Sequence, residues 1–195
     1  MKIISAQFVK TATLPAHYPA PLGPEIAFAG RSNVGKSSLI NVLTNRSNLA
    51  KASRTPGRTQ AINFFTVNDQ LSFVDLPGYG FARVPEKIRM SWGPMVETYL
   101  RERENLILLV LILDIRRDLR DDDRNFLLWM EENRLPWQMV LTKADKLSKN
   151  QALLRGRIIE EQAGISGLRK PLLFSALTGQ GKEQLWCVIK DAAGC

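Results

Sequence analysis

Residues 30–37 read GRSNVGKS and fit the pattern G-x-x-x-x-G-K-[ST] at every fixed position. Glycines allow a backbone to wrap closely around a phosphate group, so that successive N–H groups point inward. In this pattern the lysine supplies a mobile cation for the β and γ phosphates of a nucleotide, and the last hydroxyl binds Mg²⁺. The stretch therefore predicts a phosphate-binding loop in which Lys36 is the cation and Ser37 is a metal ligand.

The residues on both sides of the loop have the context that the motif requires. Residues 25–29 (EIAFA) are suited to a buried strand. The residues from Lys36 onward are suited to a helix with one apolar face, formed by Leu39, Ile40, Val42 and Leu43. The N-terminal end of such a helix adds positive charge beside the phosphate. A strand, a glycine turn and an amphipathic helix in this order argue against a chance match.

Strand and helix patterns alternate along the rest of the chain. Residues 61–67 and 71–74 are aromatic and β-branched, and the polar turn 68–70 between them predicts a hairpin. Further strands are expected at 106–113, 137–141 and 172–174, and helices within 86–104, at 122–133, at 148–161 and around 185–189. Gly93 and Pro94 are expected to disturb the first of these helices. The order predicts an α/β fold with a mostly parallel sheet, one antiparallel strand and helices on both faces.

The chain has 195 residues, which suits one globular domain. Four prolines make residues 14–24 extended, so we expect residues 1–24 to form an N-terminal extension that packs on the domain formed by 25–195. The sequence has no signal-peptide pattern and no apolar stretch long enough to span a bilayer. Its two cysteines, Cys187 and Cys195, match no metal-ligand spacing. These features predict a soluble cytoplasmic protein.

The composition is basic, with 27 Lys+Arg against 19 Asp+Glu and a net charge of +8. Such a charge favours association with polyanions such as RNA, although a merely solvated basic surface is the alternative. The acidic run 121–123 is interpreted as the first turn of a helix rather than as a metal cluster.

Residues 75–78 (DLPG) close the strand expected at 71–74. A carboxylate at a strand end beside the phosphate loop can hold Mg²⁺, usually through water, which makes Asp75 a metal ligand. Gly78 would bring a backbone N–H to the γ-phosphate. The alternative is a plain turn, since D-L-P-G is a good turn sequence.

The segment 54–60 (RTPGRTQ) lies between these two motifs. A threonine hydroxyl from it could complete the Mg²⁺ shell in the triphosphate state and leave after hydrolysis. Thr55 and Thr59 both qualify, and Thr59 is preferred because it closely precedes the strand that would position it. A solvated loop is the alternative.

Residues 142–145 (TKAD) follow the strand at 137–141. The Asp145 carboxylate can accept two hydrogen bonds from the N1–H and amine of guanine, a donor pair that adenine lacks. The methylene stem of Lys143 could lie across the base while its ammonium stays in water. Residues 175–177 (SAL) would close the pocket with N–H groups directed at the guanine oxygen.

The motifs GRSNVGKS, TPGRTQ, DLPGYG, TKAD and FSA, in this order, resemble those of the EngB (YsxC/YihA) family of bacterial ribosome-assembly GTPases, which belong to the Era-like group of P-loop G proteins. The resemblance covers nearly the whole chain from residue 25. It implies a G domain with a six-stranded sheet, GTP and GDP binding, and Mg²⁺ ligation by Ser37 and Thr59. It also implies a role in large ribosomal subunit assembly, needed for normal growth or cell division.

The nucleotide-binding residues expected from these motifs fall into five groups. They are Gly30, Arg31, Ser32, Asn33, Val34, Gly35, Lys36 and Ser37; Gly57, Arg58, Thr59, Gln60 and Ala61; Asp75, Leu76, Pro77 and Gly78; Thr142, Lys143, Ala144 and Asp145; and Phe174, Ser175 and Ala176. Among them Lys36, Thr59 and Gly78 are expected to act in hydrolysis.

Two positions depart from the pattern of many G proteins. Thr142 replaces an asparagine, so a lost side-chain bond could loosen nucleotide binding, and Tyr79 replaces the glutamine that orients the attacking water in Ras-like proteins. Intrinsic hydrolysis is therefore expected to be slow, and Tyr79 is expected to pack or face solvent. Asn33 suggests that K⁺ could assist hydrolysis, because an asparagine at this position helps to hold K⁺ in some relatives and the charge of the ion would stabilise the transition state.

Two other classes of protein are alternatives to a GTPase switch. A P-loop ATPase or kinase is disfavoured by Asp145, and a nucleotide-dependent RNA-binding scaffold with negligible turnover is kept open by Tyr79. The expected partners are GTP or GDP and the large ribosomal subunit or its rRNA, with no membrane. No feature demands more than a monomer.

Overall fold

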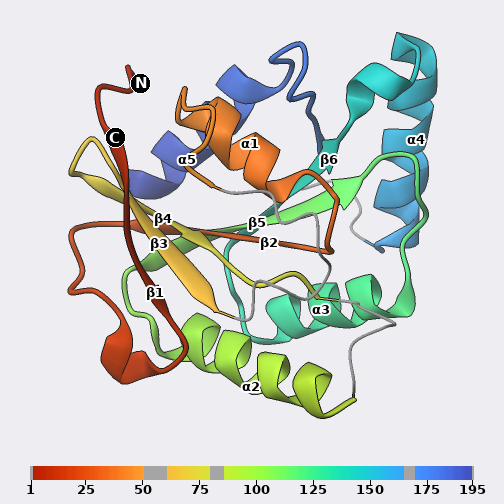
Figure 1. The fold of residues 1–195 in the computed structure, drawn as a ribbon. Coiled ribbons are helices and arrows are strands. Elements are labelled where there is room, and N and C mark those ends of the chain that lie inside the picture. Colours follow the sequence, from red (N-terminus) through yellow and green to blue (C-terminus); the bar gives the residue numbers. More distant parts are fainter. Residues whose placement is uncertain (1, 51–60, 80–85, 165–169, 195) are drawn as a thin grey trace.

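A computed structural model describes residues 2–50, 61–79, 86–164 and 170–194, with only the backbone course of 86–92 (Figure 1). Its strands are β1 (Ala6–Ala12), β2 (Glu25–Gly30), β3 (Ile62–Val67), β4 (Leu71–Asp75), β5 (Leu106–Asp114), β6 (Trp137–Thr142) and β7 (Leu172–Leu173). Its helices are α1 (Lys36–Leu43), α2 (Glu86–Glu102), α3 (Asp121–Glu132), α4 (Lys149–Gln162) and α5 (Lys182–Ala193), with short 3₁₀ turns at Pro15–His17 and Ala144–Lys146.

The strands form one sheet in the order β1-β3-β4-β2-β5-β6-β7. Strand β3 runs antiparallel to both of its neighbours, β1 and β4, and the remaining pairs are parallel. The expected α/β class and the single reversed strand are confirmed. The expected count of six strands is wrong, because β1 adds a seventh strand at the edge.

Strand β1 explains the difference. Its residues pair with β3 from Ala6 opposite Val67 to Ala12 opposite Ile62. Only the two end residues of β1 are buried, so the segment lacks the alternation of apolar residues that identifies a strand in a sequence. Backbone hydrogen bonds to β3, rather than a buried side-chain face, define this strand.

Helices cover both faces of the sheet, as Figure 1 shows. Leu39, Ile40 and Leu43 of α1 and Leu185 and Trp186 of α5 pack on one face. Helices α2, α3 and α4 contribute Tyr99, Leu127 and Ile159, among others, to the core on the opposite face. The amphipathic patterns read from the sequence therefore face the sheet.

Local signals set several helix ends. Ser148 and Gln151 form the capping box at the start of α4 that their spacing predicts, and residues 121–123 form the acidic first turn of α3. Helix α2 runs uninterrupted through Pro94, so the expected disturbance of its secondary structure is wrong. A proline removes only one backbone donor, and the rest of the helix packs on the sheet through Tyr99 and Leu100.

The parallel strands all end at one edge of the sheet. Their last residues are Gly30 in β2, Asp75 in β4, Asp114 in β5 and Thr142 in β6. Ligands of doubly wound sheets bind at this edge, where the loops leave the strands. Among the described residues, no helix is both long and apolar enough to cross a membrane.

Candidate nucleotide-binding site

The phosphate loop connects β2 to α1, as its motif requires. Within it Asn33 and Gly35 have left-handed backbone angles, with φ of 63° and 103°. Asparagine and glycine tolerate this region, so the chain can turn sharply enough to direct successive N–H groups into one hollow. Gly35 is also the N-cap of α1, and the first N–H groups of a helix have no partner within it. The loop is thus built to surround an anion.

Lys36, the first residue of α1, reaches across the loop to the end of β4. Its ammonium contacts the Asp75 carboxylate and donates to the Leu76 carbonyl at 2.7 Å. Asp75 is buried, and the next residue after Lys36 is the half-buried Ser37. A hydroxyl and a carboxylate are hard oxygen ligands of the kind that Mg²⁺ prefers. Ser37 on α1 and Asp75 at the end of β4 therefore fit the expected ion.

Gly78 lies directly against the phosphate loop. A Cβ atom on this glycine would be 2.8 Å from the Ser32 hydroxyl oxygen and 3.2 Å from the Ser32 backbone nitrogen. Only a residue without a side chain permits this approach without a shift of the loop. The backbones of Tyr79 and Arg31 then form an isolated parallel bridge, which continues the contact by one residue.

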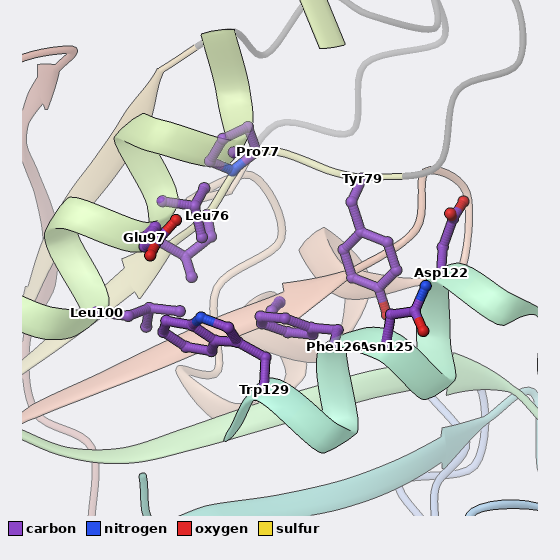
Figure 2. A pocket seen from close by; sticks show the side chains of 12 residues that line it. Leu76, Pro77, Tyr79, Glu97, Leu100, Asp122, Asn125, Phe126 and Trp129 are labelled. Atoms are coloured by element: carbon purple, nitrogen blue, oxygen red, sulfur yellow. The ribbon is translucent and has the colours of Figure 1, made fainter. Parts of the chain in front are cut away.

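Tyr79 packs inward, as one of the two expected alternatives requires. Its ring contacts Phe126 of α3, with centroids 5.4 Å apart. Figure 2 shows Tyr79 pointing toward α3 at the side of a cavity of about 370 Å³, which Trp129 and Leu100 also line. A phenol held against α3 is not placed to orient a water at the phosphates.

Asp145, the expected base reader, lies in the 3₁₀ turn after β6. Its carboxylate accepts a hydrogen bond from the Ser175 hydroxyl at 2.7 Å, and Lys146 lies 3.4 Å from the other oxygen. The hydrogen bond from Ser175, with a smaller contribution from Lys146, lowers the pKa of Asp145 below its ordinary value. The group is therefore an ionised acceptor at neutral pH, which is the state that two donors of guanine require.

Two loops hold the residues around Asp145 together. The Ala144 N–H donates to the Phe174 carbonyl at 3.1 Å, and the Phe174 N–H donates to the Leu141 carbonyl at 2.8 Å. The Leu177 N–H is bound to the Ser175 hydroxyl at 3.2 Å and the Ser175 N–H to the Gln180 carbonyl at 3.1 Å. The expectation that N–H groups of residues 175–177 point to a guanine oxygen stays a prediction. Ser175 uses its hydroxyl to shape the turn, which leaves the exposed Ala176 at the mouth of the site.

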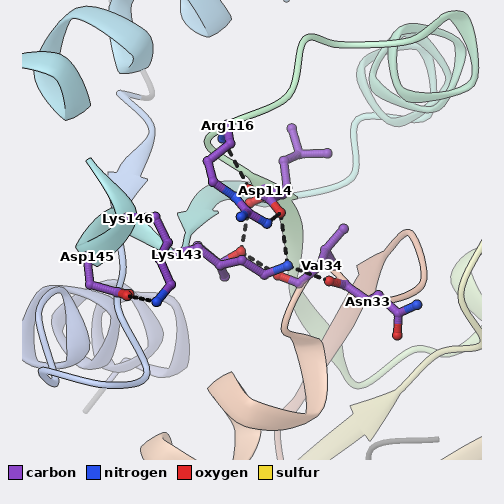
Figure 3. A network of polar contacts seen from close by, with 9 residues as sticks. Asn33, Val34, Asp114, Arg116, Lys143, Asp145 and Lys146 are labelled. Carbon is purple, nitrogen blue, oxygen red and sulfur yellow. Dashed lines mark hydrogen bonds and ion pairs between the residues drawn. The ribbon is translucent and has the colours of Figure 1, made fainter. Parts of the chain in front are cut away.

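Thr142 and Lys143 connect the base-reading turn to the phosphate loop (Figure 3). The buried Thr142 hydroxyl lies within hydrogen-bonding distance of the Val34 carbonyl and of the Leu113 carbonyl, the latter at 3.0 Å. Thr142 therefore makes a side-chain bond to the loop, although a threonine is shorter than the asparagine found in many G proteins. The expected loosening of nucleotide binding by Thr142 stays a prediction.

The Lys143 ammonium, expected to stay in water, is partly exposed and also has two protein partners. It donates to the Asn33 carbonyl at 2.7 Å and lies 2.9 Å from an Asp114 oxygen. Lys143 has a left-handed φ of 62°, which turns its side chain back over the phosphate loop. Figure 3 shows the Asn33 amide pointing away from this network.

Asp114 is a site residue that the sequence reasoning missed. Arg116 binds both of its oxygens, at 2.9 and 2.7 Å, and Lys143 binds one of them. Burial alone would raise the pKa of Asp114, but the hydrogen bonds from Arg116 and Lys143 outweigh it and hold the pKa well below the usual range. Asp114 ends a parallel strand, as Asp75 does, and that position could have identified it.

Part of the expected site lies outside the described residues. This part comprises Gly57, Arg58, Thr59 and Gln60, together with the alternative Thr55. Ala61 is described and is half-buried immediately before β3. The remaining expected residues, from the phosphate loop, the end of β4, the TKAD turn and the turn after β7, gather at one edge of the sheet.

Comparison with known proteins assigns the family. The protein family described as 50S ribosome-binding GTPase matches residues 25–143. A probable GTP-binding protein EngB from Syntrophus aciditrophicus (strain SB) is 54% identical over 194 residues, covering 100% of this chain and 98% of the relative. The chain belongs to the EngB family. Its expected assignment to a GTP-binding family with a GTPase domain is thereby confirmed.

Further relatives agree with this assignment. The probable GTP-binding protein EngB of Geobacter metallireducens is 53% identical, covering 97% of this chain and 93% of the relative. A crystal structure of a probable GTP-binding protein engB has a TM-score of 0.72 at 24% identity, covering 87% of this chain and 98% of the other. Era in complex with MgGDPNP and nucleotides 1506–1542 of 16S ribosomal RNA has a TM-score of 0.69 at 20% identity, covering 87% of this chain and 56% of that one. At these identities the two structures support the fold alone.

Proposed function

We propose that this EngB-family chain binds GTP and GDP with Mg²⁺, hydrolyses GTP slowly, and works as a switch in the assembly of the large ribosomal subunit. One observation carries the proposal. The phosphate loop and the base-reading turn are joined directly, through Lys143 to the Asn33 carbonyl and Thr142 to the Val34 carbonyl. A single nucleotide can therefore have its phosphates in the loop and its base at Asp145.

The proposed roles follow from the positions of the groups. The N–H groups of the loop and of the first turn of α1 bind the β-phosphate, and Lys36 exchanges its contact with Asp75 for the β and γ phosphates. The Gly78 N–H binds the γ-phosphate. Ser37, Thr59 and, through water, Asp75 would hold Mg²⁺, whose charge offsets that of the phosphate oxygens.

Calorimetry with GDP, a non-hydrolysable GTP analogue and ATP tests the binding part of this proposal. We expect binding of both guanine nucleotides and none of ATP, because adenine would leave the Asp145 carboxylate without donors. Binding of ATP alone would overturn the proposal. Removal of Mg²⁺ with a chelator should weaken binding of the triphosphate analogue more than binding of GDP, because the γ-phosphate contributes a ligand to the ion.

Slow turnover is proposed because Tyr79 packs on Phe126 and leaves no side chain of the DLPGY segment to orient water. We propose K⁺ as a second cation, held with the help of Asn33, whose exposed amide is not used by the Lys143 network. Phosphate release in matched K⁺ and Na⁺ buffers tests this role. A higher rate in K⁺ supports it, and equal rates in the two buffers count against it.

The ribosomal part of the proposal is supported by the family's description as ribosome-binding and by the net charge of +8. We propose that the chain acts as a cytoplasmic monomer on the large subunit or its rRNA. Sedimentation with large subunits under GDP, GTP and a non-hydrolysable analogue tests the nucleotide dependence. Single-turnover hydrolysis with and without subunits then distinguishes a GTPase switch from a scaffold with negligible turnover, the alternative that the packed Tyr79 favours.

A further inference from the structure

The first turn of α3 contacts the phosphate loop and the DLPGY segment at the same time. Asp123 of this turn is buried, and its Oδ2 lies 3.6 Å from a guanidinium nitrogen of Arg31, the residue after Gly30. The same oxygen accepts the Arg120 N–H at 3.0 Å. One carboxylate oxygen thus holds both the start of α3 and the phosphate loop.

Asp123 and Tyr79 each bring one further polar atom to the contact between α3 and the DLPGY segment. Among the described residues, Asp123 Oδ1 and the Tyr79 hydroxyl are both buried without a hydrogen-bond partner. Burial raises the pKa of Tyr79 well above its ordinary value, and the negative charge of Asp123 and hydrogen bonding toward it add to the shift, so the two groups lie within reach of one another although their geometry is not that of a formed hydrogen bond. A protonated phenol and an ionised carboxylate are a matched donor and acceptor. A buried polar group without a hydrogen bond costs free energy, and a small shift that joined the hydroxyl to the carboxylate would remove this cost.

Backbone contacts determine which movement would join them. Tyr79 is bridged to Arg31, and Gly78 lies on Ser32. Attraction of the Gly78 N–H toward a γ-phosphate would also move Tyr79, the next residue, along the phosphate loop. Its ring is guided by Phe126, which lies one turn after Asp123 on the same face of α3.

We propose that Asp123 is a positioning residue that distinguishes the triphosphate from the diphosphate state. In the triphosphate state its Oδ1 accepts a hydrogen bond from the Tyr79 hydroxyl, and the joined pair holds Gly78 over the phosphate loop. In the diphosphate state this hydrogen bond is absent. The inference rests on the proposed GTPase function and adds a regulatory contact on α3 to it.

The test compares affinities for GDP and for a non-hydrolysable GTP analogue in the wild type, Tyr79→Phe, Asp123→Asn and the double variant. Tyr79→Phe keeps the ring on Phe126 and removes only the hydroxyl. We expect Tyr79→Phe to lose about five- to tenfold in affinity for the analogue, the range of one hydrogen bond, with GDP affinity changed less than about twofold. Asp123→Asn should lose at least as much for the analogue, because the neutral amide also weakens the pairing with Arg31. The double variant should lose no more than Asp123→Asn alone, because the two residues act through one bond.

Asp121→Asn is the matched control. It removes an acidic charge from the same helical turn, but the Asp121 side chain is 93% exposed and pairs only loosely with Arg124 at 3.3 Å. Its analogue affinity should stay within about twofold of the wild type. Thermal unfolding of each variant separates a local effect from loss of the fold, and Tyr79→Phe remains informative if Asp123→Asn unfolds.

The outcomes are separable. A wild type that binds neither guanine nucleotide overturns the proposed function itself. A wild type that binds both, with Tyr79→Phe unchanged toward the analogue, overturns the role of Asp123 alone. Equal losses of affinity for GDP and for the analogue would indicate a merely structural contact. Additive losses in the double variant would indicate that the two residues do not act together. Either result also overturns the proposed role of Asp123.

Discussion

Asp145 is the residue on which base selectivity depends in the proposed site. Asp145→Asn replaces one acceptor oxygen by a donor, which suits the carbonyl of xanthine in place of the guanine amine. We expect guanine affinity to fall by about 100-fold, as two charge-assisted hydrogen bonds are lost, and xanthine nucleotides to bind better than guanine nucleotides. Competition between GDP and XDP measures the change.

Lys146→Ala is the control for this variant. Lys146 is 55% exposed at the side chain and lies 3.4 Å from Asp145, so the ion pair is weak. Guanine selectivity should survive its removal. If Asp145→Asn also keeps the wild-type selectivity, another residue reads the base.

Asp114 is expected to stabilise the site through its contacts with neighbouring side chains. Its side chain is 3% exposed and bound by Arg116 and Lys143. Its pKa is lowered, so its contribution to the free energy of unfolding is complete above the unfolded value of about 3.9 and is lost as pH falls through the lower folded value. We expect Asp114→Ala to cost about 1–3 kcal/mol at pH 7, because the hydrogen bonds of the buried carboxylate to Arg116 and Lys143 are lost.

The measurement is thermal unfolding of the wild type and Asp114→Ala between pH 7 and pH 2. The difference in Tm should be constant near neutrality and should shrink below about pH 4, where the carboxylate of the unfolded chain begins to protonate while that of the folded chain stays ionised. Asp118→Ala is the matched control, since Asp118 also pairs with an arginine, Arg155 at 2.9 Å, but is 68% exposed. A larger effect from Asp118 than from Asp114 would contradict this ranking.

At the scale of elements, one side chain of the hairpin adds three hydrogen bonds to the backbone pairing of β1 with β3. The Asn68 amide oxygen accepts from the Ile4 and Ser5 N–H groups at 2.7 and 3.1 Å, and its nitrogen donates to the Lys2 carbonyl at 2.8 Å. Asn68 lies in the turn between β3 and β4, next to the pairing of β1 with β3. We propose that residues 1–24 act as an extension that stabilises the 25–195 domain from this edge.

Two neighbouring substitutions test this proposal. Asn68 and Asp69 have nearly equal left-handed φ angles of 54° and 53°, so glycine relieves the same backbone strain at both. Asn68→Gly also removes the three hydrogen bonds and should lower stability by about 1–2 kcal/mol, which is roughly 2–8 °C in Tm. Asp69→Gly should be neutral or slightly stabilising. Equal Tm values for the two variants would mean that the N-terminal contacts do not stabilise the domain.

For the whole molecule, the net charge of +8 sets an expectation about association with the ribosome. Contacts to RNA phosphates release counterions, so affinity should fall steeply with salt. We expect sedimentation with large subunits to weaken by at least about tenfold between 50 and 200 mM salt when the nucleotide is saturating. Binding that is unaffected by salt would indicate contacts mainly with ribosomal proteins.

Most of the fold could be predicted from the sequence, because its signals are local. The hairpin, the strand–loop–helix unit of residues 25–43 and the capping box of α4 depend on residues close together in the chain. Strand β1 could not be predicted, since Phe8 and Val9 are exposed and pairing with β3 alone defines it. The buried contact of Glu25 with Tyr99 and Arg103 also joins residues more than 70 positions apart.

The sequence by itself determined which chemistry this protein carries. A phosphate loop, a carboxylate for Mg²⁺ at Asp75 and a base reader at Asp145 are predicted from residue type, spacing and position after strands. Only the tertiary structure decided how these groups are tied together: Lys143 to Asn33 and Asp114, Thr142 to Val34, and Asp123 to Arg31 beside Tyr79. Such contacts depend on which strand ends become neighbours in the sheet, and that order is a property of the folded chain rather than of any local stretch.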